Sequence, residues 1–408
     1  MSYKTNNAKN ALHGFFLSVA TTVAEPSTIL PLIVQHFSAN PILIGLFVSL
    51  LRGGAIVVQL FAAFYAQSYR RVMPYLRIVF FFRFFSWFMI GFAIFWVGDD
   101  NKTLTLWLIG TGLFFFSFSA GFGGIYFKEI IAKVFSSEER GRTMANKQFF
   151  SSFGALLSGG IAGVILEYFQ APDNYAFLFM FSAFLMLIGL FAFATIDEPA
   201  KKHISEKESS FLLFIRNACG IFRKDRRLRL QVAISLLGYA YLLSLPFIIL
   251  KAKSTFDLTG WLVGGFITIQ MIGSMLGNLL IWKRFGKHYI RMMKLAYSLI
   301  ALSLVIALFA DDPIAYASIF LLFGVAIDGF RNADMNLILE IAPEAKRPIY
   351  VAIQSTLTSI GLFFAIPGGL ILHYFGYTSL YLSSIVLLFA GFYFISRLEK
   401  IIEAEILP

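Results

Sequence analysis

The sequence predicts an all-α membrane protein made of two similar six-helix bundles, and three observations lead to this fold class. Of the 408 residues, 58% are hydrophobic and only 14% are charged, so lipid rather than water must surround most of the surface. Twelve stretches are apolar enough to cross a bilayer, which takes roughly 20 residues of helix. The second half of the chain also repeats the first at a spacing of about 207 residues, as duplicated membrane bundles do.

The internal repeat is visible in individual residues. The recurring pairs are Arg140 and Arg347, Ala145 and Ala352, Ser152 and Ser359, and Gly154 and Gly361. In each copy a basic loop is followed by a long apolar stretch rich in glycine. Such a duplication is typical of transporters, because two similar halves can rock around a site held between them.

The apolar stretches should be helices, because a backbone in lipid must satisfy its own hydrogen bonds. They cover residues 12–36, 42–66, 76–98, 104–127, 144–168, 175–196, 229–251, 258–282, 288–310, 314–340, 348–373 and 377–397. We therefore expect an N-terminal bundle over 1–196, a linker over 197–228 and a C-terminal bundle over 229–408. In the linker, apolar and basic residues alternate in a way that predicts an amphipathic helix lying on the inner leaflet.

Loop charges indicate the orientation, because cytoplasmic loops carry an excess of lysine and arginine. The loops expected on the cytoplasmic side hold Arg70, Arg71, Lys133, Arg140, Arg142, Lys147, Lys283, Arg284 and Lys287. Both termini are then cytoplasmic, and we expect a multi-pass protein of the plasma or bacterial inner membrane. This topology explains the net charge of +11 better than nucleic-acid binding does. The single cysteine, Cys219, excludes an internal disulfide and a cysteine-based metal site, and we expect no cofactor.

Two loop sequences carry a family resemblance. The loop SSEERGR at 136–142 resembles the E-R-R-G-R turn of the major facilitator superfamily, and PEAKRP at 343–348 is its counterpart. The segment RFGK at 284–287 is similar to the end of the family's G-x-x-x-D-R-x-G-R-K signature. In the first half of this chain, Gln67 stands roughly where the family has the aspartate of that signature. The resemblance implies alternating access, with an altered inner latch. It places five arginines at the inner gate: Arg70, Arg71, Arg140, Arg284 and Arg347.

Charged side chains inside a span are costly in lipid and therefore mark candidate functional positions. Glu25 precedes Pro26 in the first span, and Arg52 lies in the second span at a depth that differs by roughly 5 Å, from the helical rise. The two could form an ion pair, either a static packing contact or a switch between paired and protonated states. In the family, a first-helix carboxylate often couples proton movement to transport. Arg83, in the third span, is expected to snorkel to the inner face.

The tenth span is the most highly charged. Asp328, Arg331 and Asp334 recur every three residues, which predicts one polar stripe that faces the protein interior. The stripe could be a self-neutralised gate network, or it could contact substrate or protons. Further candidate cavity residues are Tyr239, Tyr241, Gln270 and Asn332, although a core tyrosine with a local partner is a simpler explanation for the first two.

These features together predict a secondary active transporter that moves a small organic solute, and we expect the movement to be coupled to protons. A flippase or exporter of lipid or hydrophobic compounds with the same fold is the alternative. A membrane-embedded enzyme is disfavoured, because the 5 histidines are scattered and no HExxH, GxSxG or phosphate-binding glycine loop occurs. We expect a monomer whose partners are the solute, a proton or other coupling ion, and membrane lipids.

Overall fold

The chain folds into helices throughout the part that the structure, a computed structural model, describes. This part comprises residues 3–23, 25, 27–66, 69–200, 211–285, 288–343 and 346–406. Nine helices in it are long and apolar enough to cross a membrane, and the described residues contain no strand. The predicted all-α, multi-pass membrane architecture is thus confirmed. The chain divides into two compact units, Met1–Ala39 with Phe47–Lys207 and Leu258–Thr268, and Asn40–Leu46 with Glu208–Asp257 and Ile269–Pro408.

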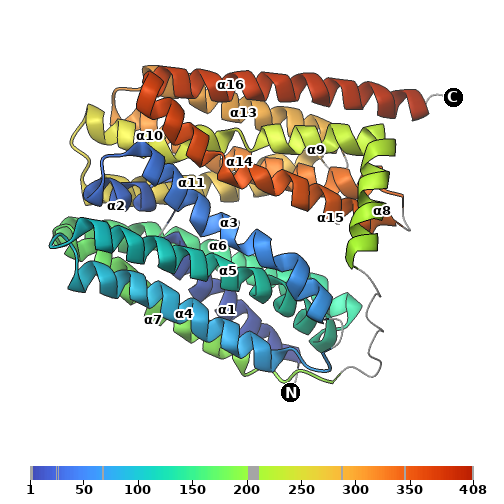
Figure 1. Ribbon diagram of the computed structural model, residues 1–408, viewed down its shortest axis with the longest axis horizontal. Coiled ribbons are helices and arrows are strands. Elements are labelled where there is room, and N and C mark those ends of the chain that lie inside the picture. The colour runs from blue at the N-terminus through green and yellow to red at the C-terminus, as the bar shows by residue number, and fades with distance from the viewer. Residues whose placement is uncertain are drawn as a thin grey trace. The chain divides into compact units, whose positions relative to one another are not determined.

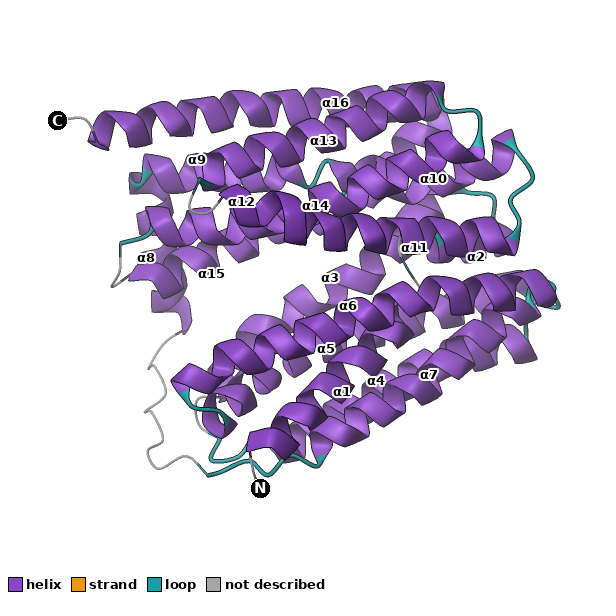
Figure 2. Cartoon of the chain, turned by 180° about the vertical axis from the view of Figure 1, so that it is seen from behind, coloured by secondary structure: helices purple, strands orange, loops and turns teal. Residues whose placement is uncertain are grey.

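The N-terminal half of the chain contains seven helices. They are α1 (Tyr3–Thr22), α2 (Ile29–Phe37), α3 (Pro41–Ala66), α4 (Met73–Trp96), α5 (Lys102–Val134), α6 (Ser137–Tyr168) and α7 (Asp173–Ala194). α1 packs against α6 and α7, and α4 lies beside α7 (Figure 2). The outward face of α4 carries a row of exposed rings that includes Phe81, Phe85 and Phe92. Exposed aromatic side chains of this density suit a surface covered by lipid.

The C-terminal half begins with an amphipathic helix and continues with the second bundle. Its helices are α8 (Phe211–Lys224), α9 (Arg226–Gly238), α10 (Tyr241–Thr255), α11 (Gly260–Leu276), α12 (Lys283–Phe285), α13 (Tyr289–Phe309), α14 (Pro313–Ile341), α15 (Arg347–Thr358) and α16 (Ala365–Ile406). A π-helix, η1 (Gly277–Trp282), follows α11, and a 3₁₀-helix, η3 (Ser359–Phe363), follows α15. α13 and α16 run side by side (Figure 1).

Polar residues at the helix starts explain several boundaries. Ser136 and Glu139 form a capping box at the start of α6, which accounts for the acidic part of the loop at 136–142. Asp225 caps α9 and Asp312 caps α14 through their side-chain oxygens. Inside α16, Gly376 has φ 77°, a left-handed conformation that only glycine adopts without strain, so the chain bends there between the last two predicted spans.

Four predicted spans are not continuous α-helices, and this corrects the sequence-based expectation. One is the eighth, which passes from α11 into the π-helix η1. The first span is two helices, because α1 ends at Thr22 and α2 begins at Ile29. The seventh is divided at Tyr239 and Ala240, where the N–H groups of Tyr239, Ala240, Leu242 and Leu243 each donate to the carbonyl three residues earlier. The eleventh passes from α15 into the 3₁₀ segment η3. Short 3₁₀ stretches within a longer helical path often mark hinges.

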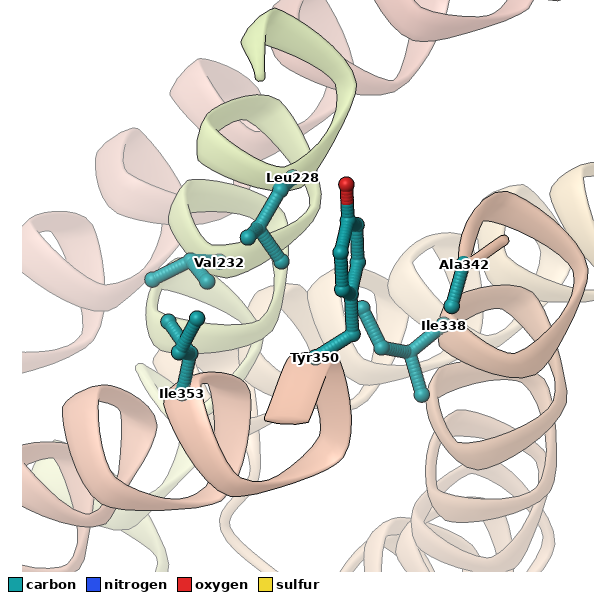
Figure 3. Close-up of a cluster of buried hydrophobic side chains, with 6 residues drawn as sticks. All are labelled: Leu228, Val232, Ile338, Ala342, Tyr350 and Ile353. Carbon is teal, nitrogen blue, oxygen red and sulfur yellow. The ribbon is translucent and has the colours of Figure 1, made fainter. Parts of the chain in front are cut away.

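The amphipathic helix predicted in the linker exists, but part of its apolar face is covered by protein. Ala218, Ile221 and Phe222 of α8 pack against a buried cluster of the C-terminal bundle. Figure 3 shows this cluster, made of Leu228, Val232, Ile338, Ala342, Tyr350 and Ile353. α8 runs across the ends of α9 and α15 (Figure 1). α8 is therefore docked on the C-terminal bundle beside α9 and α15.

Candidate functional site

Asp334 on α14 is the centre of a buried hydrogen-bond network in the C-terminal bundle. Its Oδ1 accepts the amide of Gln231 at 2.9 Å and that of Gln354 at 2.8 Å. The Ser235 hydroxyl donates to the same oxygen. Gln231 and Ser235 come from α9 and Gln354 from α15, and all three are buried. The carboxylate thus ties α14 to two other helices through neutral donors.

The two helices that donate to Asp334 both end at a 3₁₀ break, and these breaks touch. A Cβ on Gly361 in η3 would lie 2.6 Å from the Cβ of Tyr239, where α9 ends. The Phe330 ring, one turn before Asp334 on α14, stands edge-on to Tyr239 with centroids 5.5 Å apart. A Cβ on Gly238 would lie 2.1 Å from the same ring. Glycine is required at 238 and 361 because the neighbouring rings occupy the space of a side chain.

Asp328 makes a separate set of contacts. Its Oδ2 accepts the Asn278 amide at 2.8 Å and the Ser274 hydroxyl. Asn278, in η1, in turn accepts a bond from the Asn332 amide at 3.1 Å, so one asparagine bridges two successive turns of α14. π-Helical segments of this kind are frequent at functional sites.

The packing of η1 on α14 depends on Trp282 and Gly329. The Trp282 indole donates to the carbonyl of Val325 at 3.0 Å. A Cβ on Gly329 would lie 2.2 Å from the Trp282 ring. The glycine therefore lets the indole approach α14, next to the Asp328 contact with Asn278.

Asp328 and Asp334 do not belong to one continuous charged stripe on α14, contrary to the prediction from the sequence. Asp328 faces α11 and η1, whereas Asp334 faces α9 and α15, so the two carboxylates serve different networks. Arg331 and Asn332, which lie between them, are exposed. Of the predicted cavity residues, Tyr241 and Gln270 are buried and Tyr239 is half-buried at the break.

The expected pairing of Glu25 and Arg52 is not observed. Glu25 lies in the interruption between α1 and α2 and accepts a hydrogen bond from the Ser27 hydroxyl at 3.1 Å. Arg52 is half-buried on α3. In the described residues no ion pair joins the two side chains.

The N-terminal bundle holds a cluster that sequence reasoning missed. His13 on α1 is 3% exposed, and neither ring nitrogen has a hydrogen-bond partner among the described residues. Its ring lies between Phe80, Phe127 and Phe193, with centroids 4.9 to 5.7 Å away. The only sequence signal was the spacing of Asn6, Asn10 and His13, which lie on one face of α1 and are buried.

Two cations accompany His13 inside this bundle. The Lys147 ammonium lies 3.8 Å from the centroid of the Phe127 ring, on which His13 also stacks. The Arg83 guanidinium lies 4.6 Å from the Phe116 centroid, and its buried Nε has no partner among the described residues. The expectation that Arg83 snorkels is therefore wrong, because aromatic faces inside the bundle hold its charge.

The arginines predicted at the inner gate occupy loops and helix ends. Arg140 donates to the carbonyls of Phe135 at 3.1 Å and Ala132 at 2.6 Å, so it caps the end of α5. Arg70 and Arg71 are exposed between α3 and α4, and Arg284 is exposed in α12. The side chain of Arg347 lies outside the described residues.

Glu198 is a further structural charge at this end of the N-terminal bundle. It is 3% exposed and accepts the backbone N–H groups of Val72 and Met73, at 2.9 and 2.7 Å, at the start of α4. The Lys133 ammonium lies 2.5 Å from it and 3.6 Å from Glu129. The set fixes the segment after α7 to α4 and α5. The described residues contain no group of acidic, histidine or cysteine side chains suited to a metal ion.

Comparison with known proteins adds a decisive observation. Residues 11–365 match the family model of the Major Facilitator Superfamily. The chain belongs to this superfamily. Its members are secondary transporters rather than enzymes, which agrees with the predicted class. A search of curated protein sequences gives no match.

Solved structures of superfamily transporters share this fold. A point mutant of the nucleoside transporter NupG is 14% identical with a TM-score of 0.73, covering 95% of this chain and 99% of its own. A POT family transporter in complex with 5-aminolevulinic acid is 12% identical with a TM-score of 0.73, covering 96% of each chain. The xylose transporter XylE from E. coli is 17% identical with a TM-score of 0.65, covering 98% of each. The TM-scores establish a common fold, while the named cargoes differ.

Proposed function

We propose that this superfamily transporter moves a small organic solute by alternating access and that Asp334 couples the movement to protons. The observation that carries the proposal is the position of Asp334, which accepts three neutral donors from α9 and α15, the two helices that end at the touching breaks. An intramembrane carboxylate is costly to keep and is a functional candidate by default.

The proposed switch follows from the chemistry of these hydrogen bonds. Bonds to an ionised carboxylate are roughly twice as strong as neutral ones. Protonation of Asp334 would weaken its bonds to Gln231, Ser235 and Gln354 together. α9 and α15 would then be free to move against α14, and the 3₁₀ breaks offer the places where each helical path can bend.

The N-terminal bundle suggests the charge of the solute. His13, Arg83 and Lys147 provide donors and positive charge inside it, and the described residues pair none of the three with a carboxylate. Buried cations of this kind favour a solute that carries a negative charge. The loop charges support a position in the plasma or bacterial inner membrane, with Arg70, Arg71, Arg140, Arg284 and Arg347 at a cytoplasmic gate.

The test begins with a thermal-shift screen of purified protein against organic acids, sugars, nucleosides and hydrophobic drugs. A ligand found in this way is then used with proteoliposomes. Asp334→Asn should abolish uptake driven by a pH gradient while exchange of labelled for unlabelled ligand continues, because the variant keeps the shape of the site but cannot titrate. Glu25→Gln serves as the comparison. If Asp334→Asn still accumulates the ligand normally, Asp334 is rejected as the coupling group. The same holds if Glu25→Gln loses accumulation and Asp334→Asn does not.

A further inference from the structure

A basic pocket lies at the cytoplasmic end of the C-terminal bundle, as the loop charges orient it. Its volume is about 520 Å³, and Lys224, Arg226, Arg227 and Lys346 line it. These residues come from the end of α8, the start of α9 and the turn before α15. Two segments that are more than a hundred residues apart, 224–227 and the turn at Lys346, thus bring four cations to one cavity.

The single carboxylate in the pocket wall does not neutralise this charge. Asp225 uses Oδ1 to accept the N–H groups of Arg227 at 2.8 Å and Leu228 at 3.2 Å. Its Oδ2 accepts the Tyr350 hydroxyl at 2.5 Å. Four cations against one acid leave an excess of three positive charges. In the described residues, Lys224, Arg226 and Lys346 have no ion-pair partner.

Part of the pocket lining is apolar. The Tyr350 ring lies on the buried cluster between Leu228 and Ile338, with its hydroxyl pointing away from the cluster (Figure 3). Ile221 of α8 and Ile401 of α16 complete the lining. An occupant with both an anionic group and an apolar part therefore fits better than a simple ion.

We propose that this pocket binds a phosphate group, and that an anionic phospholipid of the inner leaflet provides it. Basic pockets between transmembrane helices on the cytoplasmic side hold such headgroups through clustered lysine and arginine. The amphipathic α8, whose end forms one wall, combines an apolar face with Arg223 and Lys224 in its last turn, a pattern typical of helices that lie among lipid headgroups. This site is independent of Asp334, so either proposal can fail without the other.

The test uses full-length protein in neutral detergent and three soluble probes. They are dihexanoyl phosphatidylglycerol, dihexanoyl phosphatidylcholine and glycerol phosphate, with binding measured by calorimetry. Phosphatidylglycerol should bind and phosphatidylcholine should not. Lys224→Gln/Lys346→Gln should weaken the binding about thirty-fold, because each cation near a lipid surface contributes roughly a five- to six-fold effect.

The matched control removes two charges elsewhere. Lys253→Gln/Arg291→Gln takes away two exposed cations outside the pocket and should bind phosphatidylglycerol like the wild type. Equal binding by both double variants would overturn the site. Glycerol phosphate binding as tightly as the lipid would overturn the lipid as the source of the phosphate. Ile221→Ser keeps every charge, and its weaker binding of the lipid with unchanged binding of glycerol phosphate would support the apolar contact.

Discussion

The side-chain amide of Gln354 on α15 donates to Asp334 on α14 at 2.8 Å and to the Ser235 hydroxyl of α9 at 3.0 Å. One glutamine thus joins three helices of the C-terminal bundle. Gln354→Leu should lower the stability of the protein by about 2 kcal/mol, because a hydrogen bond to a charged group is lost in a buried place. Thermal unfolding in detergent measures the change.

A double-mutant cycle tests whether the charge of Asp334 is responsible. In the Asp334→Asn background, Gln354→Leu should have a smaller effect, because the neutral amide accepts a weaker bond. Ser355→Ala is the control on the same helix, since its hydroxyl donates only locally, to the carbonyl of Ala352. Equal effects of Gln354→Leu in the two backgrounds would show that the charge of Asp334 does not strengthen this bond.

Gly329→Ala should disturb the contact between η1 and α14. The added methyl group would lie 2.2 Å from the Trp282 ring, so the indole must shift and its bond to Val325 must lengthen. We expect a loss of about 1–3 kcal/mol, typical of an overpacked site. Gly124→Ala, where a Cβ meets nothing within 4 Å, should be neutral or stabilising. Similar unfolding temperatures for the two variants would contradict this account.

Glu198→Ala should destabilise the N-terminal bundle by about 3 kcal/mol or more, because it leaves Lys133 without its closest carboxylate and two N–H groups of α4 without an acceptor. Glu129→Gln removes the other, more exposed acid near Lys133, and its effect should stay below about 1 kcal/mol. Thermal unfolding of both variants provides the comparison, and a larger effect at Glu129 would disprove the assignment.

His13→Phe separates a structural from a functional role of the buried histidine. Three phenylalanine rings surround His13 and its nitrogens have no partner among the described residues, so a fourth phenylalanine should keep or raise the unfolding temperature. We expect transport of the ligand found by screening to fall nonetheless. Unimpaired transport would show that His13 only fills space.

Tyr350→Phe should change how stability depends on pH. Burial alone would raise the pKa of the Asp225 carboxyl, but the hydrogen bond from Tyr350 and those from the N–H groups of Leu228 and Arg227 lower it below its ordinary value. A lowered carboxyl pKa stabilises the fold above about pH 4, the unfolded value, and this contribution disappears as pH falls through the folded value.

The variant should therefore unfold at a lower temperature than the wild type at pH 7, and the difference should shrink below about pH 4. Unfolding curves from about pH 3 to pH 7 cover this range. A difference that stays constant across them would mean that Tyr350 acts through packing on its cluster rather than through Asp225.

The helical membrane architecture and the main loops were predictable because apolar length and loop charge act locally. The start of α6 follows from Ser136 and Glu139, which lie three residues apart in a capping box. The break at Tyr239 and Ala240 was not predictable, since the one neighbouring glycine, Gly238, is also tolerated inside a continuous transmembrane helix. It is enclosed by Phe330 and Gly361, which come from other parts of the chain.

The candidate site was predictable only as a charged residue in a span. Asp334 stood out by its cost in lipid, but its partners Gln231, Ser235 and Gln354 are neutral, and two of them are about a hundred positions away. Arg83 was misjudged for a similar reason, because the ring that holds its charge, Phe116, belongs to the next helix. Tertiary contacts, rather than local pattern, decide these positions.

Because the breaks at Tyr239 and Gly361 touch, a small rotation of α9 about this point would move its Asp334 contacts by a larger distance farther along the helix. Gln231 lies eight residues along α9 from Tyr239, or about 12 Å at the helical rise. A tilt of only about 5° around this joint would displace Gln231 by about 1 Å, enough to lengthen its 2.9 Å bond beyond hydrogen-bonding distance. A small rotation of α9 is thus enough to break the hydrogen bond that protonation of Asp334 would weaken.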